Sequence, residues 1–368
     1  MRKRVHIVLA VLLVMLAGVA AWQGLREREP VYQGKSLSKW LEDYTALRGA
    51  FTLGGATVGF VGAGGGMQGY RFDSAKVDAA VRQIGTNALP TLLRMLRVKD
   101  SALRLKLERF ARQHTGFRVE FTPDGTLNVH NVHRVIDLSL TSSEALRFRA
   151  VAAFRALGGE ARRAVPELIE IYKQMPERGP WGAGAALGSI GPDASAAIPS
   201  LLRNVGNTNA VAREIAVTAL GEIHAQPQLV VPALIAALHD PAQSVELAAL
   251  AALGRYGEEA KTAVPALVAI LKAERNPITL ANAAAVLGRI HADPEVVVPA
   301  LIAALHHPVQ KVRIECLCAL REFGAEAKPA VPALLEFLKS QADATDKTVA
   351  ASALKAIDPA AAVKPGVR

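Results

Sequence analysis

Six prolines recur at nearly constant spacing through most of the chain, each in a short phrase of alanine, valine or isoleucine and leucine. They are Pro166, Pro199, Pro232, Pro265, Pro299 and Pro332, and they step by 33, 33, 33, 34 and 33 residues. An apolar residue, such as Leu220 or Leu253, lies twelve positions before each proline. A fixed period of this length indicates stacked supersecondary units, each of which leaves its apolar face uncovered until a neighbour packs on it.

Each unit is expected to be a pair of helices. Apolar residues recur at helical spacing over 212–223 and again over 231–238, with the proline in the first turn of the second helix, where its missing N–H is tolerated. Gly158, Gly191, Gly257 and Gly324 each lie eight residues before a proline, so they are expected to end the first helix in a left-handed cap. Composition agrees, because 51% hydrophobic but only 5% aromatic residues favours helices over a β-sandwich or barrel.

Two units are near copies of each other, and histidine replaces the capping glycine in both. Residues 230–239 and 297–306 share the sequence VVPALIAALH, and His224 corresponds to His291. We expect these imidazoles to bond to the free carbonyls at the helix end and to face the negative end of its dipole.

An insertion interrupts the array near its beginning. An early copy of the unit spans Val81–Leu96, but 76 residues separate Pro90 from Pro166, which leaves an extra segment at about 111–142. Alternating apolar residues on both sides of Pro123-Asp124-Gly125 predict a short hairpin there. Since the insertion breaks a regular array, it is a candidate functional loop.

The N-terminal segment has the pattern of a membrane anchor. Three basic residues precede an apolar run from Val5 to Trp22, which as a helix would reach ~27 Å and just span a hydrocarbon core. The basic flank predicts a cytoplasmic N-terminus and an exported remainder, which in a bacterium means a single-pass inner-membrane protein with its solenoid in the periplasm. Cleavage near Ala20-Ala21, giving a secreted or periplasmic protein, is the alternative.

Three regions follow from these patterns: residues 1–24 as signal anchor or signal peptide, 25–71 as a linker, and 72–368 as the solenoid. The linker is expected to hold one amphipathic helix, since Leu37, Trp40, Leu41 and Tyr44 have helical spacing after a Ser36 N-cap. It also holds the glycine-rich stretch 49–69, whose last six residues match GxGxxG. Because no strand-rich sequence follows to form a βαβ unit, we interpret this stretch as a flexible loop rather than a dinucleotide site.

The repeated phrases resemble those of the HEAT family of α-solenoids, in particular the repeats first named after phycobilisome chromophore lyases. Together with the N-terminal pattern, they make the chain similar to bacterial HEAT-repeat proteins that have a signal anchor. The resemblance rests on Ala219-Leu220-Gly221, Ala252-Leu253-Gly254 and the A-V-P-A-L phrases, and covers about residues 72–358. It implies an all-α, right-handed solenoid of about seven helix pairs that serves as a protein-binding scaffold. The family often carries an Asp and an Arg six residues apart as a ladder between units. Because the corresponding pairs here include Asn207 with Arg213 and Asp240 with Glu246, the ladder is expected to be broken.

Patterns that would carry chemistry are scarce, so we predict a non-enzymatic protein with no cofactor and no metal. The sequence contains no HExxH, GxSxG or Cys-x-x-Cys motif and none of the His-Glu dipeptides that ligate iron in a hydroxylase of the resembling family. Cys316 and Cys318 point about 200° apart on a helix and are interpreted as reduced structural thiols. His130 and His133, with His114 nearby, lack a carboxylate or thiolate that would complete a metal site.

Basic residues gather between Thr91 and Glu120, and we take them as a candidate binding ridge for an acidic protein or anionic lipid headgroups. The ridge comprises Arg94, Arg97, Lys99, Arg104, Lys106, Arg109 and Arg112. Export disfavours nucleic acid as the partner, and no small-molecule substrate is identifiable.

The sequence therefore predicts a membrane-tethered scaffold that binds a peptide or protein surface along a groove lined by the second helices. An enzyme or accessory subunit, with its site in the Gly49–Gly69 and Ala111–Ser142 insertions, is the alternative.

Overall fold

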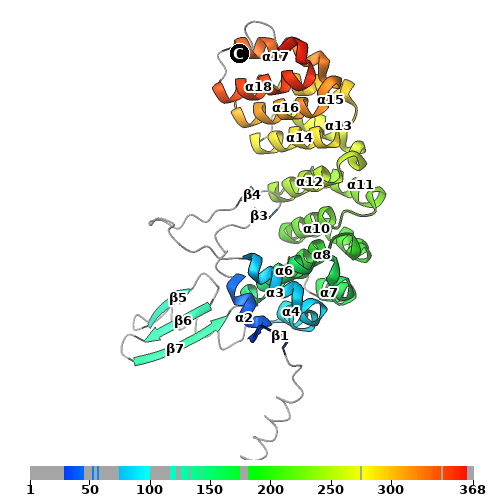
Figure 1. Cartoon of the computed structure of the whole chain (residues 1–368). Coiled ribbons are helices and arrows are strands. Elements are labelled where there is room, and N and C mark those ends of the chain that lie inside the picture. Colours follow the sequence, from blue (N-terminus) through cyan, green and yellow to red (C-terminus); the bar gives the residue numbers. More distant parts are fainter. Residues whose placement is uncertain are drawn as a thin grey trace, which may run out of the picture.

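The computed structural model describes residues 29–44, 74–99, 143–174, 181–273, 276–340 and 343–362, together with the backbone of short strands between 52 and 141. Seven consecutive helix pairs follow one another in these ranges, stacked as a column with the first helices in one layer and the second helices in another (Figure 1). The predicted all-α solenoid is therefore confirmed. The predicted hydrophobic helix at the N-terminus lies outside the described residues.

The first three pairs are α3 (Ser74–Ile84) with α4 (Leu89–Arg97), α6 (Ser143–Leu157) with α7 (Val165–Lys173), and α8 (Trp181–Ile190) with α9 (Ile198–Val205). The next four are α10 (Ala210–Ile223) with α11 (Pro227–Ala237), α12 (Gln243–Tyr256) with α13 (Val264–Lys272), α14 (Pro277–Ile290) with α15 (Pro294–Ala304), and α16 (Gln310–Phe323) with α17 (Val331–Lys339). The incomplete last copy forms α18 (Ala344–Ile357) and the short α19 (Pro359–Ala362).

Two kinds of connection join the helices of a pair. In five pairs a glycine with positive φ leads into a 3-10 helix: η2 (Gly85–Ala88), η3 (Gly158–Ala164), η4 (Gly191–Ala197), η5 (Gly257–Ala263) or η6 (Gly324–Ala330). At Gly257, φ is 51° and ψ is −130°, a combination that essentially only glycine adopts. The predicted helix ends at Gly158, Gly191, Gly257 and Gly324 are confirmed, but the predicted left-handed cap is wrong at Gly257 and Gly324, where ψ of −130° lies outside the left-handed helical region. In the α10–α11 and α14–α15 pairs, His224 and His291 adopt the left-handed conformation instead.

The histidine-type connection also changes where the second helix begins. Helices α11 and α15 begin at Pro227 and Pro294, so Pro232 and Pro299 lie inside the helix. The prediction that every repeated proline occupies the first turn is therefore wrong for these two units. The extra proline five residues earlier starts the helix in place of the 3-10 segment, and the interior proline is tolerated at the loss of one backbone hydrogen bond.

The core runs the length of the column and is built from the positions that recur with the prolines. Leu220, Leu253, Leu287 and Leu320 are fully buried in successive first helices, and Leu234 and Leu267 are fully buried in second helices. Because each of these side chains is covered partly by its own pair and partly by the next, burial depends on stacking.

Close approach between neighbouring first helices depends on the glycine of the A-L-G phrase. A Cβ built at Gly221 would lie 2.5 Å from the Cβ and 2.8 Å from the backbone Cα of Ala252 in the next unit. At Gly254 the nearest atoms, Arg289 Nη1 and Val286 Cγ2, both lie 3.3 Å away and belong to side chains. The glycine–alanine contact thus sets how closely α10 and α12 pack.

Residues that the sequence assigned to a linker form the first end of the stack. The predicted helix is present as α2 (Leu37–Glu42), preceded by a two-stranded ribbon of β1 (Val31–Tyr32) and β2 (Lys35–Ser36). Leu37 and Leu41 are fully buried within the same core cluster as the helix pairs, and the Tyr44 hydroxyl donates to Asp78 Oδ1 of α3 at 2.5 Å. This segment therefore covers the apolar face that the first helix pair would otherwise leave open.

The insertion forms a three-stranded antiparallel sheet, in which β6 (Thr126–Asn131) lies between β5 (Phe117–Phe121) and β7 (Arg134–Thr141) (Figure 1). The predicted hairpin is confirmed as β5–β6, with Phe117 paired to Asn131 and Phe121 to Leu127. The third strand was not predicted. In the glycine-rich stretch, β3 (Thr52–Leu53) pairs antiparallel with β4 (Ala56–Thr57), whereas the GxGxxG residues lie outside the described part.

The glycine–alanine contact predicts opposite outcomes for two equivalent substitutions. Gly221→Ala should lower the free energy of unfolding by about 1–2 kcal/mol, because a clash with backbone outweighs the gain of ~1 kcal/mol in helix propensity. Gly254→Ala is the matched control: its neighbours can rotate away, so it should be neutral or stabilising by up to ~1 kcal/mol. Urea unfolding followed by circular dichroism measures both, and equal shifts for the two variants would refute the role assigned to Gly221.

Candidate interaction surfaces

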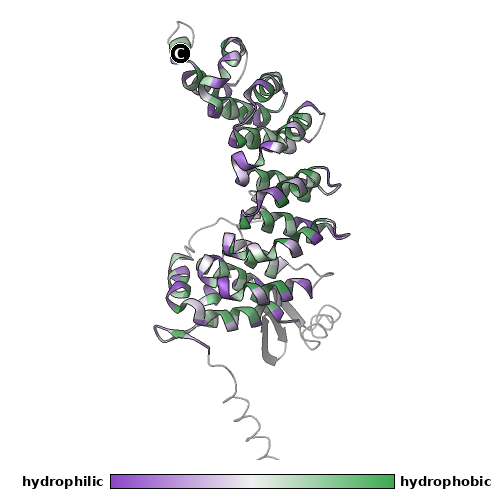
Figure 2. Cartoon of the chain, turned by 90° about the vertical axis from the view of Figure 1, so that its right-hand side faces the viewer, coloured by the Kyte–Doolittle hydropathy of each residue, from purple (hydrophilic) through white to green (hydrophobic). Residues whose placement is uncertain are grey.

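The outer surface of the second helices changes character along the column. Four residues after the repeated proline, α7, α9 and α17 carry the charged residues Glu170, Arg203 and Glu336. At the same position α11, α13 and α15 carry alanine, at 236, 269 and 303. Helix α11 contains no charged residue, and α13 and α15 each contain one, at an end. The middle of this layer, which Figure 2 views from the side of the second helices, therefore presents a surface with few charges, in which Lys272 and Glu295 are the only charged residues of the three helices.

Large apolar side chains add to that surface at corresponding positions of the two histidine-type units. Leu229 is 57% exposed in the first turn of α11, and Val296 is 51% exposed in the first turn of α15. We name the exposed apolar residues of these three helices the apolar face; it comprises Leu229, Pro232, Ala236, Pro265, Ala269, Val296, Pro299 and Ala303. Contiguous apolar surface of this kind marks interaction sites more often than isolated exposed leucines do.

Polar contacts bridge successive units, contrary to the expectation of a broken ladder. Arg213 binds Asp240 of the following unit through two contacts of 2.7 Å, with side-chain exposures of only 13% and 9%. Arg213 Nη1 also donates to the carbonyl of Asn207 at 2.8 Å. Although Asn207 stands where Arg213's own pair would have an aspartate, the guanidinium binds a carboxylate one unit further on, so a bidentate rung is present.

Two further rungs join equivalent positions of successive first helices, one through a threonine and a glutamate and the other through an arginine and an aspartate. Thr279 Oγ1 donates to Glu246 Oε2 at 3.1 Å, and both side chains are buried. Arg313 Nη2 lies 2.6 Å from Oδ2 of Asp346, which is fully buried. Polar rungs and apolar packing therefore hold the stack together.

The histidine at the end of α10 or α14 contacts the next unit rather than the carbonyls of its own helix. His224 Nε2 lies 3.1 Å from Glu259 Oε2, and its ring meets the Tyr256 ring edge-on with centroids 4.8 Å apart. His291 repeats the arrangement with Glu326 at 3.1 Å and a stacked Phe323 ring at 4.8 Å. The predicted carbonyl contact is thus replaced by a bridge between units.

Three residues of the predicted basic ridge are described, and they lie on or just after α4. Arg94 and Lys99 are exposed, while Arg97 Nη1 pairs with Glu167 Oε1 of α7 at 2.6 Å. The other four predicted members, Arg104, Lys106, Arg109 and Arg112, lie outside the described residues. The described part of the ridge is therefore an exposed basic surface on the second helix of the first unit.

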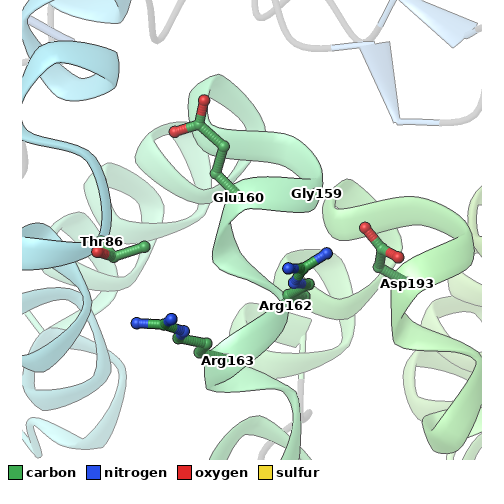
Figure 3. Close-up of a pocket in the computed structure, with 6 residues that line it drawn as sticks. All are labelled: Thr86, Gly159, Glu160, Arg162, Arg163 and Asp193. Carbon is green, nitrogen blue, oxygen red and sulfur yellow. The ribbon is translucent and has the colours of Figure 1, made fainter.

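A hollow of about 520 Å³ lies at the connections of the first three units (Figure 3). It is lined by Thr86 of η2, by Gly159, Glu160, Arg162 and Arg163 of η3, and by Asp193 of η4. Sequence reasoning missed it because its residues come from three turns. The adjacent arginines in GGEARRAVP were the only signal available.

The described residues provide little support for nucleophilic chemistry. Cys316 is buried and Cys318 half-buried, both are free thiols, and burial raises the pKa of Cys316 to about 12, so its thiol stays protonated at neutral pH. Burial also raises the pKa of Glu222, although Arg255 and Arg155 oppose the shift. No group of three or more histidines, cysteines, aspartates or glutamates is placed to hold a metal ion within the described ranges. His114, His130 and His133, and the side chains of both insertions, lie outside them.

Trp181 opens α8. Its side chain is partly buried and packs against the core. Gly184, in the same helix, allows close contact with its neighbours, since a Cβ there would lie 2.5 Å from Ile215 Cγ2. The structure therefore assigns this tryptophan a packing role.

Comparison with known families finds a similarity to HEAT repeats in the second half of the chain. Residues 198–279 and 264–355 match the family model of HEAT repeats, which covers α9 through most of α18. The expected resemblance to HEAT-type repeats is therefore supported for this part of the chain. No curated protein matches the sequence.

Several engineered repeat proteins are similar to the structure at low sequence identity. A designed armadillo repeat protein is 20% identical over 53% of this chain and 100% of its own, with a TM-score of 0.40. A structure of computationally designed armadillo repeat proteins for modular peptide recognition is 22% identical over 54% of this chain and 94% of its own, with a TM-score of 0.38. Another engineered protein is 17% identical over 86% of this chain and 78% of its own, with a TM-score of 0.42. Because all three TM-scores are below 0.5, we base the fold assignment on the helix pairs of this chain and not on these similarities.

The Arg213–Asp240 rung predicts an acid-dependent loss of stability. Its hydrogen bonds with Arg213 lower the pKa of Asp240, so the folded chain holds a carboxylate where the unfolded chain would begin to bind a proton. The stabilisation is present above the usual aspartate pKa of ~3.9 and is lost as pH falls through the lower folded value. Asp240→Asn should therefore lower the free energy of unfolding by about 1–3 kcal/mol at pH 7, and it should have no effect once the pH lies below the pKa of Asp240 in the folded chain.

Chemical unfolding at pH 7, 5, 4 and 3 measures this convergence. Glu258→Gln, at an exposed position, provides the control and should leave the free energy of unfolding unchanged throughout. A constant difference between the native chain and Asp240→Asn down to the lowest pH would contradict the assigned role of the carboxylate.

Proposed function

We propose that this chain is a protein-interaction scaffold, a binding protein rather than an enzyme, that holds an extended peptide or protein surface against its second helices. The observation that carries the proposal is the apolar face of α11, α13 and α15, which is exposed although the flanking units carry charges at the same positions. Solvation gives no reason for three adjacent helices to carry only two charged residues, Lys272 and Glu295, both near helix ends, whereas a partner that covers the rest of their exposed surface does.

The spacing of the two largest exposed side chains suggests what the partner presents. Leu229 and Val296 lie two units apart, and two steps between packed helices amount to about 16–20 Å. An extended peptide rises about 3.3 Å per residue, so five or six residues would separate two apolar side chains that contact both positions. A partner segment with apolar residues at this spacing is therefore favoured.

Panning a displayed peptide library against the chain tests this proposal. The native chain should enrich peptides with two apolar residues five or six positions apart, and Leu229→Lys with Val296→Lys should abolish the enrichment by adding charge to the apolar face. Val211→Lys is the matched control, because Val211 is 53% exposed on a first helix and lies outside the face. Enrichment of the same peptides by the double variant would refute the proposed surface.

The proposal extends to a membrane tether. The basic residues before Val5 and the apolar run up to Trp22 support an anchor, with the repeat column on the exported side of a bacterial inner membrane. In the described ranges, no helix is both long enough and apolar enough to cross a membrane, and residues 1–28 lie outside those ranges.

Cell fractionation distinguishes a retained membrane anchor from a cleaved signal peptide. With the anchor retained, the protein should sediment with membranes, resist high salt and dissolve in detergent. Recovery in a soluble exported fraction, with a new N-terminus near Ala20 or Ala21, would contradict the tether and support cleavage.

A further inference from the structure

Charge is distributed unevenly along the column. The first two helix pairs, in residues 74–99 and 143–174, carry eleven lysines and arginines against five aspartates and glutamates. The following described range, 181–273, carries five against seven. An approaching acidic segment would therefore be drawn to the first end of the stack, where the hollow lies.

Two arginines in that hollow have no partner among the residues that the structure describes. Within the described residues, neither Arg162 nor Arg163 takes part in a hydrogen bond or ion pair, whereas nearby Arg97 is paired with Glu167. Figure 3 shows Arg163 extending toward Thr86 on one side of the hollow, Arg162 beside Asp193 on the other, and Glu160 pointing away from both. The side with Arg163 and Thr86 therefore offers donors without an opposing carboxylate.

The donors suit a carboxylate. A guanidinium presents parallel N–H groups that match the two oxygens of a carboxylate, and a threonine hydroxyl adds a further donor. Such charge-assisted hydrogen bonds hold a carboxylate more tightly than a diffuse basic surface does, because the donors of the guanidinium have a fixed geometry.

This pair of arginines is a feature of one unit, not of the repeat. At the position of Arg162 the later 3-10 helices carry Ser195, Lys261 and Lys328, so a cation there is common. At the position of Arg163 they carry Ala196, Thr262 and Pro329. The second guanidinium is therefore an addition to the η3 turn among the described 3-10 helices of this length.

We propose that the hollow formed by Thr86, Arg162 and Arg163 binds the carboxylates of an acidic segment in a protein partner. The inference rests on the proposed function, because the apolar face further along the column is a surface for a polypeptide rather than for nucleic acid or a free anion. The partner's acidic segment lies at the turns of the first three units, and its apolar residues lie on α11 and α15.

Fluorescence anisotropy of a labelled octaglutamate peptide, titrated with the full chain in non-ionic detergent, tests the site. Arg162→Ala with Arg163→Ala should weaken binding about 10- to 100-fold, as expected for lost hydrogen bonds between charged groups. Arg162→Lys with Arg163→Lys keeps the charge and loses the paired donors, so it should weaken binding by about threefold or more. Binding should also weaken as salt rises.

Two variants guard against misfolding and general charge as explanations. Lys261→Ala with Lys328→Ala removes the same charge from equivalent turns and should leave affinity within about twofold. Asp193→Asn should strengthen binding by about two- to fivefold, because it removes a negative charge beside Arg162, and an unfolded chain cannot produce a gain.

If Lys261→Ala with Lys328→Ala weakened peptide binding as much as Arg162→Ala with Arg163→Ala, the proposal would be overturned in favour of diffuse electrostatic attraction. Displacement of the peptide by anionic lipid micelles at lower concentration than by unlabelled peptide would overturn it in favour of a lipid surface. Leu229→Lys with Val296→Lys should leave octaglutamate binding unchanged, so failure of the hollow and failure of the apolar face give different results.

Discussion

Stacking of neighbouring first helices is the interaction on which the rest of the structure depends. Each helix pair is too thin to enclose a dry interior, and the leucines that recur with the prolines are buried only because the next pair covers them. The A-L-G glycine allows this cover to come close, since the space that a side chain would need is filled by the following alanine at Gly221. Polar rungs such as Arg213–Asp240 add direction to the contact, because a two-contact ion pair holds adjacent units in one register.

Periodicity made most of this architecture predictable from sequence. Helix pairs, their breaks at glycine and the incomplete last copy all follow from a pattern repeated many times, so local ambiguity at one unit is resolved by the others. The misses fall where the pattern has variants. Pro227 and Pro294 begin helices that the repeated proline alone would place later, and Arg213 pairs with a residue from the following turn, which spacing within a unit does not reveal.

Surface function was less predictable, because surfaces join residues from several units. The apolar face could be predicted in part from the sequence of α11, which has no charged residue, and from that of α15, which has only Glu295, but its continuation through α13 depends on stacking. The hollow combines Thr86, Arg163 and Asp193, which are far apart in sequence. A basic cluster within one stretch of sequence was recognisable, whereas a site assembled from three turns was not, since nothing local distinguishes a solvated arginine from one beside a cavity.

Histidine-type and glycine-type connections alternate from α10 to α17, so this part of the column repeats every two helix pairs. His224 needs the aromatic ring and the glutamate of a glycine-type neighbour, and His291 finds the same neighbour two pairs later. Excision of the α12–α13 pair alone would seat His224 beside Ile290, which offers no aromatic ring, whereas removal of two successive pairs restores a matching junction. Growth or shortening of this part of the array is therefore easiest by doublets, and a partner that follows it would change its reach by the same increment.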